Sequence, residues 1–148
     1  MQISMEGKVA LVTGGSRGIG KAIAATMAAA GAKVMISSRK QDALDAAAAE
    51  MDGEVATFAA NAGDPASARA VVAATIERFG GLDVLVNNAA TNPYYGPTME
   101  VDEARFDKTF QVNLRGPLFW CQAAWDQAMK DRPGVIVNIA SVGGMRSE

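Results

Sequence analysis

Histidine is absent from the 148-residue chain, and cysteine occurs once, at Cys121. Without histidine, the chain cannot form a Ser-His-Asp triad or a histidine-ligated zinc site. A single cysteine excludes an internal disulfide and a cysteine metal cluster, so we expect no metal site and a reducing, cytoplasmic compartment. Chemistry in this chain is left to hydroxyls, amides, carboxylates, lysine, arginine or a bound cofactor.

The chain also lacks an excess of basic residues and a long apolar run. Lys and Arg number 14 against 16 Asp and Glu, which gives a net charge of −2. This balance argues against a nucleic-acid partner or an anionic membrane surface. No apolar run has membrane-spanning length, and the segment 1–8 lacks the apolar region of a signal peptide. We therefore expect one soluble domain over residues 1–148, with no membrane partner.

Short apolar runs alternate with helical patterns along the whole chain. Such alternation predicts right-handed βαβ units and an α/β fold, a doubly wound parallel sheet with strand order 3-2-1-4-5. Ligands of such sheets bind at the carboxyl ends of the strands. The expected strands are 9–13, 33–38, 55–60, 82–87 and 135–140, and the expected helices are 17–30, 42–51, 65 to about 80, and 102 to about 130.

The strand expected at 135–140 is as apolar as a central strand, although only residues 141–148, read as the start of a loop, follow it. It would form an exposed apolar sheet edge, which proteins avoid. We therefore expect that a partner chain covers it, or that the domain is truncated after strand five and lacks the C-terminal strands and helices of a complete fold.

A glycine-rich turn, Gly14-x3-Gly18-x-Gly20, joins the first strand to the first helix. Glycines let the backbone approach a pyrophosphate, and the free N–H groups of the helix start favour an anion. The simpler alternative is tight packing between a strand and a helix. Because the motif follows a strand and opens a helix in the first βαβ unit, we favour a dinucleotide site.

The end of the second strand, Ser37-Ser38-Arg39, indicates which nucleotide binds. NAD enzymes and methyltransferases place a carboxylate there to bind a ribose diol. A guanidinium and two hydroxyls suit a 2′-phosphate instead, and Arg17 could reach the same group. The alternative is that both arginines are solvated surface charges. We predict NADP(H), with NAD(H) less favoured. The carboxyl-end residues, namely the glycine turn, Arg39, Asn61, Asn87, Asn88 and Ser141, are expected to line one crevice.

Taken together, Thr13-Gly14-x3-Gly18-x-Gly20, Asn87-Asn88-Ala89-Ala90, Asn113 and Ser141 resemble the short-chain dehydrogenase/reductase family. The resemblance is greatest to the N-terminal portion of 3-oxoacyl-carrier-protein-reductase-like members. It implies a Rossmann-type fold and an NAD(P)(H)-dependent oxidoreductase of small-molecule carbonyls and alcohols, assembled as a dimer or tetramer.

The resemblance also implies cofactor-binding residues. Asn61 and Ala62 match an adenine-contacting pair that is often Asp-Val in the family, and Ala90 replaces the usual glycine of Asn-Asn-Ala-Gly. Asn88 and Ala89 match the segment that passes the adenine ribose. The full predicted set is Gly14, Ser16, Arg17, Gly18, Ile19, Ser38, Arg39, Asn61, Ala62, Asn88, Ala89 and Ala90.

Asn113 and Ser141 are the catalytic candidates that the resemblance implies. Pro117 has no N–H to donate to the carbonyl of Asn113, so we expect a kink near Gly116-Pro117 that leaves this carbonyl free. In the family, the matching carbonyl holds a water of the proton relay. The serine hydrogen-bonds the substrate oxygen.

The family's Tyr-x3-Lys pair is missing from the sequence, because neither Tyr94 nor Tyr95 has a lysine four residues later. Two interpretations stay open. The chain is the N-terminal part of an NADP(H)-dependent carbonyl reductase, or it is a non-catalytic nucleotide-binding or interaction protein.

The helix expected from 102 to about 130 is apolar on more than one face, which indicates burial on several sides. Core packing alone would explain this pattern. The family's oligomers pair this helix with its mate, so we expect a homo-oligomer interface around Phe106, Phe110 and Trp120.

Overall fold

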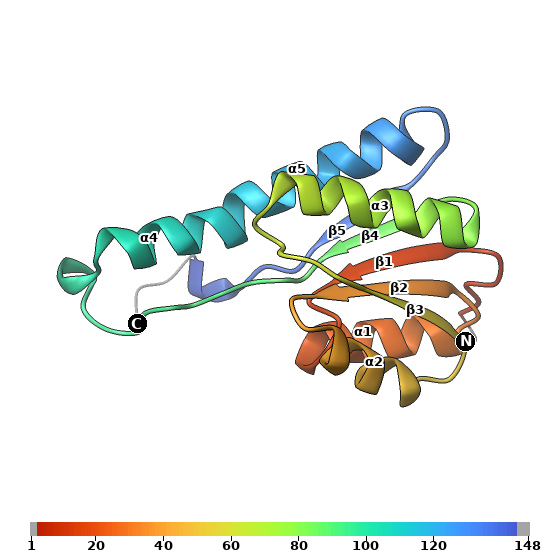
Figure 1. Cartoon of the computed structure of the whole chain (residues 1–148), viewed down its shortest axis with the longest axis horizontal. Coiled ribbons are helices and arrows are strands. Elements are labelled where there is room, and N and C mark those ends of the chain that lie inside the picture. The colour runs from red at the N-terminus through yellow and green to blue at the C-terminus, as the bar shows by residue number, and fades with distance from the viewer. Residues whose placement is uncertain (1–2, 145–148) are drawn as a thin grey trace.

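Five β-branched, apolar segments form one parallel sheet with the order β3-β2-β1-β4-β5 in the computed structural model, which describes residues 3–144 (Figure 1). The predicted fold class and strand order are confirmed. The predicted ends of strands and of the first three helices lie within 2 residues of the observed ones. The strands are β1 (Val9–Thr13), β2 (Lys33–Ser38), β3 (Glu54–Ala59), β4 (Val84–Asn87) and β5 (Val135–Asn138).

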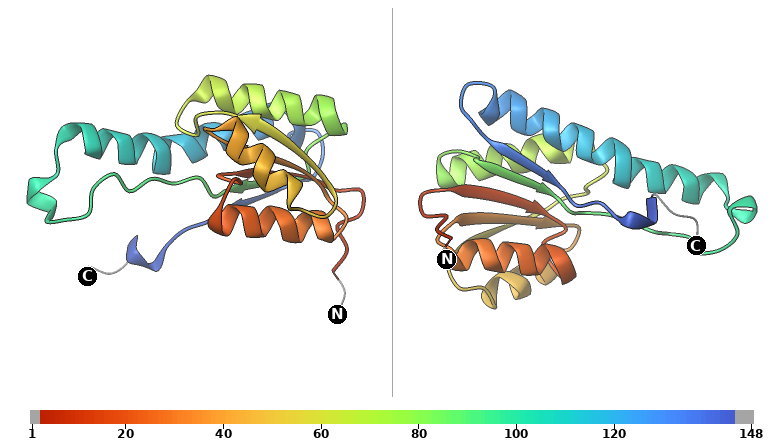
Figure 2. Two further views of the ribbon diagram at one scale, coloured as in Figure 1. Left: turned by 60° about the horizontal axis from the view of Figure 1, so that its bottom comes forward. Right: turned by 180° about the vertical axis from the view of Figure 1, so that it is seen from behind.

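Helices cover both faces of the sheet (Figures 1 and 2). One face carries α1 (Gly18–Ala29) and α2 (Gln41–Ala49), and the other carries α3 (Pro65–Phe79) and α5 (Gly116–Ala124). In β1, side chains alternate between the two layers: Leu11 belongs to the core beneath α3 and α5, and Val12 to the core beneath α1 and α2. Burial on both sides explains why the central strands are apolar throughout.

The register places the carboxyl ends of neighbouring strands side by side. Thr13 pairs with Ser37 between β1 and β2, and Asn87 pairs with Asn138 between β4 and β5. All neighbouring strands are parallel, so the segments that follow them leave the sheet at one edge. This edge is where the sequence predicts ligand binding.

The long helix expected from 102 to about 130 is divided into four parts. Asp102 caps it by accepting a hydrogen bond from the Arg105 N–H at 2.8 Å, as its position predicts. α4 (Glu103–Phe110) is followed by a π-helical turn, η2 (Gln111–Arg115), then by α5, and by a second π-helical turn, η3 (Trp125–Met129).

The expected break near Gly116-Pro117 therefore takes the form of the η2 turn, and the rod stays continuous (Figure 1). Within this turn the Gly116 N–H donates to the carbonyl of Gln111, five residues earlier. Since Pro117 has no N–H, it cannot continue the ordinary i to i+4 bonding, and the wider turn accommodates it. Two short 3-10 helices complete the described elements, η1 (Thr98–Glu100) and η4 (Val142–Gly144).

β5 is an edge strand, and its apolar side chains are exposed. Val135, Ile136 and Val137 all remain open to solvent, in contrast to the buried residues of β4. The expectation of an uncovered apolar edge is met in residues 3–144. Residues 145–148, expected to continue the loop after β5, lie outside the described residues.

Asp83, directly before β4, joins three separate segments at the amino ends of the strands. Its carboxylate accepts hydrogen bonds from the Val9 N–H at 2.8 Å and from Arg132 Nη2 at 2.5 Å. Only 8% of Asp83 is exposed, so neither bond is easily replaced by water.

Replacing Asp83 with alanine should lower the free energy of unfolding by about 2 kcal/mol, because the N–H of Val9 loses its acceptor in the interior. Urea denaturation measures the change. Glu50→Ala is the matched control, since it removes the exposed Lys21–Glu50 pair and should change stability by less than about 0.5 kcal/mol. Equal urea midpoints for the two variants would contradict this role of Asp83.

Asp64 caps α3, with Pro65 in the first turn, as the sequence predicts. Hydrogen bonds from the hydroxyl and N–H of Ser67 lower the pKa of Asp64 below its ordinary value of 3.8. A carboxylate whose pKa is lower in the folded state stabilises the fold above the unfolded pKa. That stabilisation is lost as the pH falls through the folded pKa.

Asp64→Asn keeps a capping side chain and removes this titration. The difference in unfolding free energy between the unchanged chain and the variant should be largest near neutral pH and shrink below about pH 5. Denaturant titrations over this range test it, and a difference that does not vary with pH would refute it.

Candidate functional site

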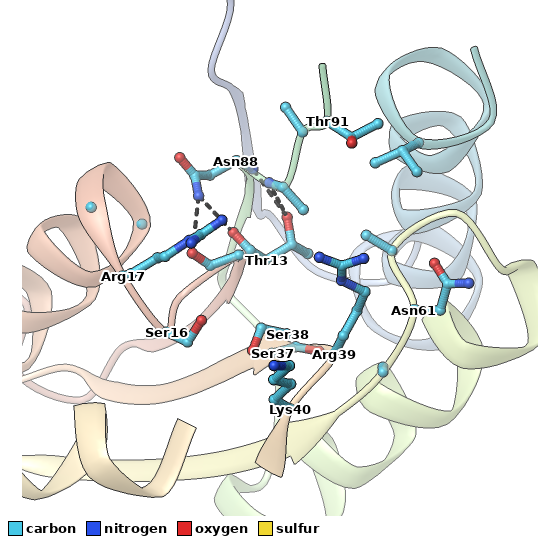
Figure 3. A pocket seen from close by; sticks show the side chains of 18 of the residues that line it. Thr13, Ser16, Arg17, Ser37, Ser38, Arg39, Lys40, Asn61, Asn88 and Thr91 are labelled. Carbon is cyan, nitrogen blue, oxygen red and sulfur yellow. Dashed lines mark hydrogen bonds between the residues drawn. The ribbon is translucent and has the colours of Figure 1, made fainter. Parts of the chain in front are cut away.

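A cleft of about 630 Å³ opens at the carboxyl ends of β1, β2 and β3, beside the segment that follows β4 (Figure 3). All 12 residues predicted to bind the cofactor line it, from Gly14 to Ala90. The cleft therefore brings together four segments that are distant in the sequence. Its other lining residues are Thr13, Gly20, Ser37, Lys40, Ala43, Ala60, Thr91, Lys108, Val112 and Trp120.

The glycine turn has the shape that its spacing predicts. Gly14 and Gly18 have φ values of +68° and +54°, which glycine adopts without strain. A Cβ on Gly20 would collide with the carbonyl oxygen of Gly14, whereas a Cβ on Gly18 would meet nothing within 4 Å. The turn is thus tight on its inner side and open toward the cleft, as a backbone cradle for a phosphate requires.

The start of α1 has no side-chain cap from this chain. Arg17 occupies the N-cap position with an extended backbone and makes no capping hydrogen bond, and the first turn holds no acidic residue. The first helical residues, Gly18, Ile19 and Gly20, line the cleft. Free N–H groups and the positive end of the helix dipole favour an anion at this position.

Thr13 and Asn88 connect the glycine turn to the segment after β4. The hydroxyl of Thr13 accepts hydrogen bonds from the N–H groups of Asn88 and Ala89, both at 3.0 Å. Asn88 Nδ2 donates to the carbonyls of Thr13, at 2.9 Å, and Gly14, at 3.3 Å. Thr13 is not among the cofactor-binding residues that the sequence predicts, although it lines the cleft. Its position directly before the first glycine is the signal that could have identified it.

Positive charge dominates the cleft. In the view of Figure 3, Arg17 and Arg39 lie on either side of Thr13. Lys40 and Lys108 also line the cleft, and no acidic residue does among those that the structure describes. The two lysines were not predicted. Lys40 directly follows Arg39 and could have been inferred, whereas Lys108 is brought in by α4, far along the sequence.

Asn113 does not line the cleft but holds a segment that does. Its Oδ1 accepts a hydrogen bond from the Thr91 N–H, and its Nδ2 donates to the Thr91 carbonyl, both at 2.8 Å. The side chain thereby pairs with both backbone polar groups of Thr91. Sequence reasoning had assigned a role to the backbone carbonyl of Asn113 and missed this function of its side chain.

Ser141 is exposed and lies outside the cleft, where its hydroxyl accepts a hydrogen bond from the Gly143 N–H at 3.1 Å. Asn87 also lies outside, so the expectation of one crevice containing both residues is wrong. Successive side chains of a strand alternate in direction, and Asn87 therefore points away from Asn88. It is buried, and its Nδ2 donates to Asn138 Oδ1 at 2.9 Å.

Trp120 is not at an outer surface, which corrects the expectation that it forms a subunit interface. Only 2% of it is exposed, and it belongs to the core beneath α3 and α5. Its Nε1 donates to the carbonyl of Ala62 at 3.0 Å. The family resemblance implies an interface on this helix, and only packing shows that Trp120 faces inward while Phe106 and Phe110 are exposed.

Within residues 3–144, no group of three or more histidine, cysteine, aspartate or glutamate side chains is arranged to hold a metal ion. None of the helices in that range combines the length and apolarity needed to cross a membrane.

Comparison with known proteins identifies relatives along nearly the whole chain. The family model described as short chain dehydrogenase matches residues 8–148. Dehydrogenase/reductase SDR family member 4 of Homo sapiens is 39% identical over 138 residues, which cover 91% of this chain and 50% of that protein. Levodione reductase of Leifsonia aquatica is 38% identical over 144 residues, 94% of this chain and 54% of that protein.

Solved structures agree with this result. The crystal structure of levodione reductase aligns with a TM-score of 0.91 at 37% identity, covering 97% of this chain and 57% of that one. A short-chain type dehydrogenase/reductase from Mycobacterium marinum aligns with a TM-score of 0.92 at 30% identity, covering 99% of this chain and 59% of that one.

The chain spans about half the length of the curated relatives named here. The comparisons do not specify the finer resemblance to 3-oxoacyl-carrier-protein reductases. The glycine turn, the strand order and the match over residues 8–148 agree, and the chain belongs to the short-chain dehydrogenase family.

Proposed function

We propose that residues 1–148 form a single NAD(P)-binding domain of an NADP(H)-dependent oxidoreductase. The enzyme would transfer hydride between the nicotinamide and a small-molecule carbonyl or alcohol. The observation that carries the choice of NADP(H) is Arg39 at the end of β2, in a cleft lined by cations and, among the described residues, by no acid. A 2′-phosphate suits this charge, whereas a free ribose diol is better bound by a carboxylate.

The cleft offers a distinct set of groups to each part of NADP(H). The turn that contains Gly14, Ser16 and Gly18, with Ile19 after it, would hold the pyrophosphate through backbone N–H groups. Arg17, Ser38 and Arg39 would bind the 2′-phosphate. Asn61 and Ala62 would contact the adenine, and Asn88, Ala89 and Ala90 would pass the ribose. The bound cofactor would donate or accept the hydride.

Ser141 and Asn113 are the proposed catalytic groups. Ser141 would hydrogen-bond the substrate oxygen, and the carbonyl of Asn113 would support a proton relay. The printed sequence contains no Tyr-x3-Lys pair to supply the acid. The lone cysteine suits a reducing cytoplasm, which is the location that we propose.

We also propose that the chain assembles with a second copy of itself through an apolar stripe on α4, η2 and α5. The stripe consists of Phe106, Phe110, Leu114 and Leu118, all exposed and spaced by four residues. The rings of Phe106 and Phe110 lie 4.4 Å apart. Exposed apolar side chains in such a row indicate a partner, and a second copy with two-fold symmetry would cover the stripe with itself.

Arg39→Ala should weaken NADPH binding by about 10- to 100-fold, because one charge-assisted contact to the 2′-phosphate is lost. NADH lacks this phosphate, so its affinity should not change. Isothermal titration calorimetry with both nucleotides measures the ratio of affinities.

Arg69→Ala is the matched control for this experiment. Arg69 is an exposed arginine on α3, pairs with Asp126 at 3.5 Å and does not line the cleft. It should leave both affinities unchanged. If Arg39→Ala left the ratio of the affinities for NADPH and NADH unchanged, the NADP(H) assignment would be wrong.

Leu114→Asp should convert the dimer to a monomer without loss of helical circular dichroism, because a carboxylate would be buried in the stripe. Leu114 is 63% exposed in the single chain, so the fold itself should tolerate the change. Sedimentation velocity measures the assembly. Met99→Asp, at a 95% exposed site outside the stripe, should leave the dimer intact. A monomeric unchanged chain would overturn the proposed assembly.

A further inference from the structure

The loop that follows β3, residues 61–63, rests on the helical segment 111–120. Arg115 Nη2 donates to the carbonyl of Gly63 at 3.3 Å, and a Cβ on Gly63 would lie 3.0 Å from Cγ of Gln111. A Cβ on Gly116 would lie 2.5 Å from the carbonyl oxygen of Ala62. Glycines at positions 63 and 116 therefore allow the loop and the helix to approach closely.

The buried side chain of Trp120 supplies a further hydrogen bond to this contact. Its indole N–H donates to the carbonyl of Ala62 at 3.0 Å, and only 2% of the residue is exposed. Trp120 also lines the cleft, next in space to Ala62, which lines it too. An indole has a single donor, so the bond fixes both the ring and the carbonyl that it meets.

The same helical segment holds the loop that follows β4. Asn113 pairs with the N–H and carbonyl of Thr91, and Thr91 lines the cleft. One stretch of helix thus contacts two walls of the cleft, one that includes Asn61 and Ala62 and the other built from residues 88–91. The π-helical turn η2 forms the first half of this stretch.

We propose that Trp120 is a positioning residue that holds Asn61 and Ala62 in place at the adenine end of the cleft. This inference rests on the proposed nucleotide-binding function. Trp120 acts through the carbonyl of Ala62. Its loss therefore weakens the binding of any nucleotide that carries adenosine, with or without a 2′-phosphate.

The test compares Trp120→Phe with Trp125→Phe, the only other tryptophan, which is exposed and does not line the cleft. Trp120→Phe keeps an aromatic ring and removes the donor. It should weaken the binding of NADPH and of NADH by the same factor, about tenfold, so that the ratio of the two affinities is unchanged. Trp125→Phe should change neither affinity. By contrast, Arg39→Ala should change the ratio.

Hydrogen exchange reports on the loop without any ligand. The amide of Gly63, which donates to Asn61 Oδ1 at 3.1 Å, should exchange faster in Trp120→Phe than in Trp125→Phe. Amides in the β1–β2 core should exchange equally in both variants if the effect is confined to the loop. A merely structural role for Trp120 would speed exchange in the core as well and would overturn the inference.

A third measurement leaves Trp120 in place and applies even if Trp120→Phe does not fold. In Trp125→Phe, Trp120 is the only indole, and its fluorescence should change when NADPH or NADH is added. No change would overturn the inference. Unchanged affinities in Trp120→Phe would also overturn it, while leaving the proposed function intact. A chain that binds neither nucleotide would instead overturn the proposed function itself.

Discussion

The junction between Thr13 and Asn88 is the contact on which the cleft depends. The Thr13 hydroxyl accepts hydrogen bonds from two backbone N–H groups of the segment after β4. The side-chain amide of Asn88 donates to the carbonyls of Thr13 and Gly14. These bonds hold the glycine turn against the neighbouring crossover at the point where the sheet reverses its strand order. Without these bonds, the two loops would still lie at the carboxyl ends of the strands, but their positions relative to each other would not be fixed.

Two sides of the continuous helical segment formed by α4, η2 and α5 make different contacts. One side carries Asn113 and Trp120 to the loops that border the cleft. Another carries the exposed apolar stripe that includes Phe110 and Leu114. A subunit that packs on the stripe would therefore contact the same helical segment that holds the loops of the cleft. Subunit assembly and nucleotide binding would then both depend on the position of this segment.

Charge and burial in the cleft complement each other. Four cationic side chains line the cleft and no acidic residue does in the described part of the chain, so the lining offers no carboxylate that would compete with an anionic ligand. The glycine turn is held by partly buried hydrogen bonds and by Gly14 and Gly20, where a Cβ would meet neighbouring atoms too closely. The first property favours binding of a phosphate, and the second reduces the ordering that binding requires.

The sequence by itself determined the strand order, the glycine turn and the caps at Asp64 and Asp102, and it named the residues, predicted to bind a cofactor, that line the cleft. The elements, the turn and the caps follow from local patterns, because periodicity, capping and turn chemistry act over a few residues, whereas the full set of predicted cofactor residues follows from the family resemblance. Only the tertiary structure decided that Asn87 turns away from Asn88, that Trp120 is buried against Ala62, and that Asn113 pairs with Thr91. These outcomes depend on contacts between segments more than 20 residues apart, which no local pattern encodes.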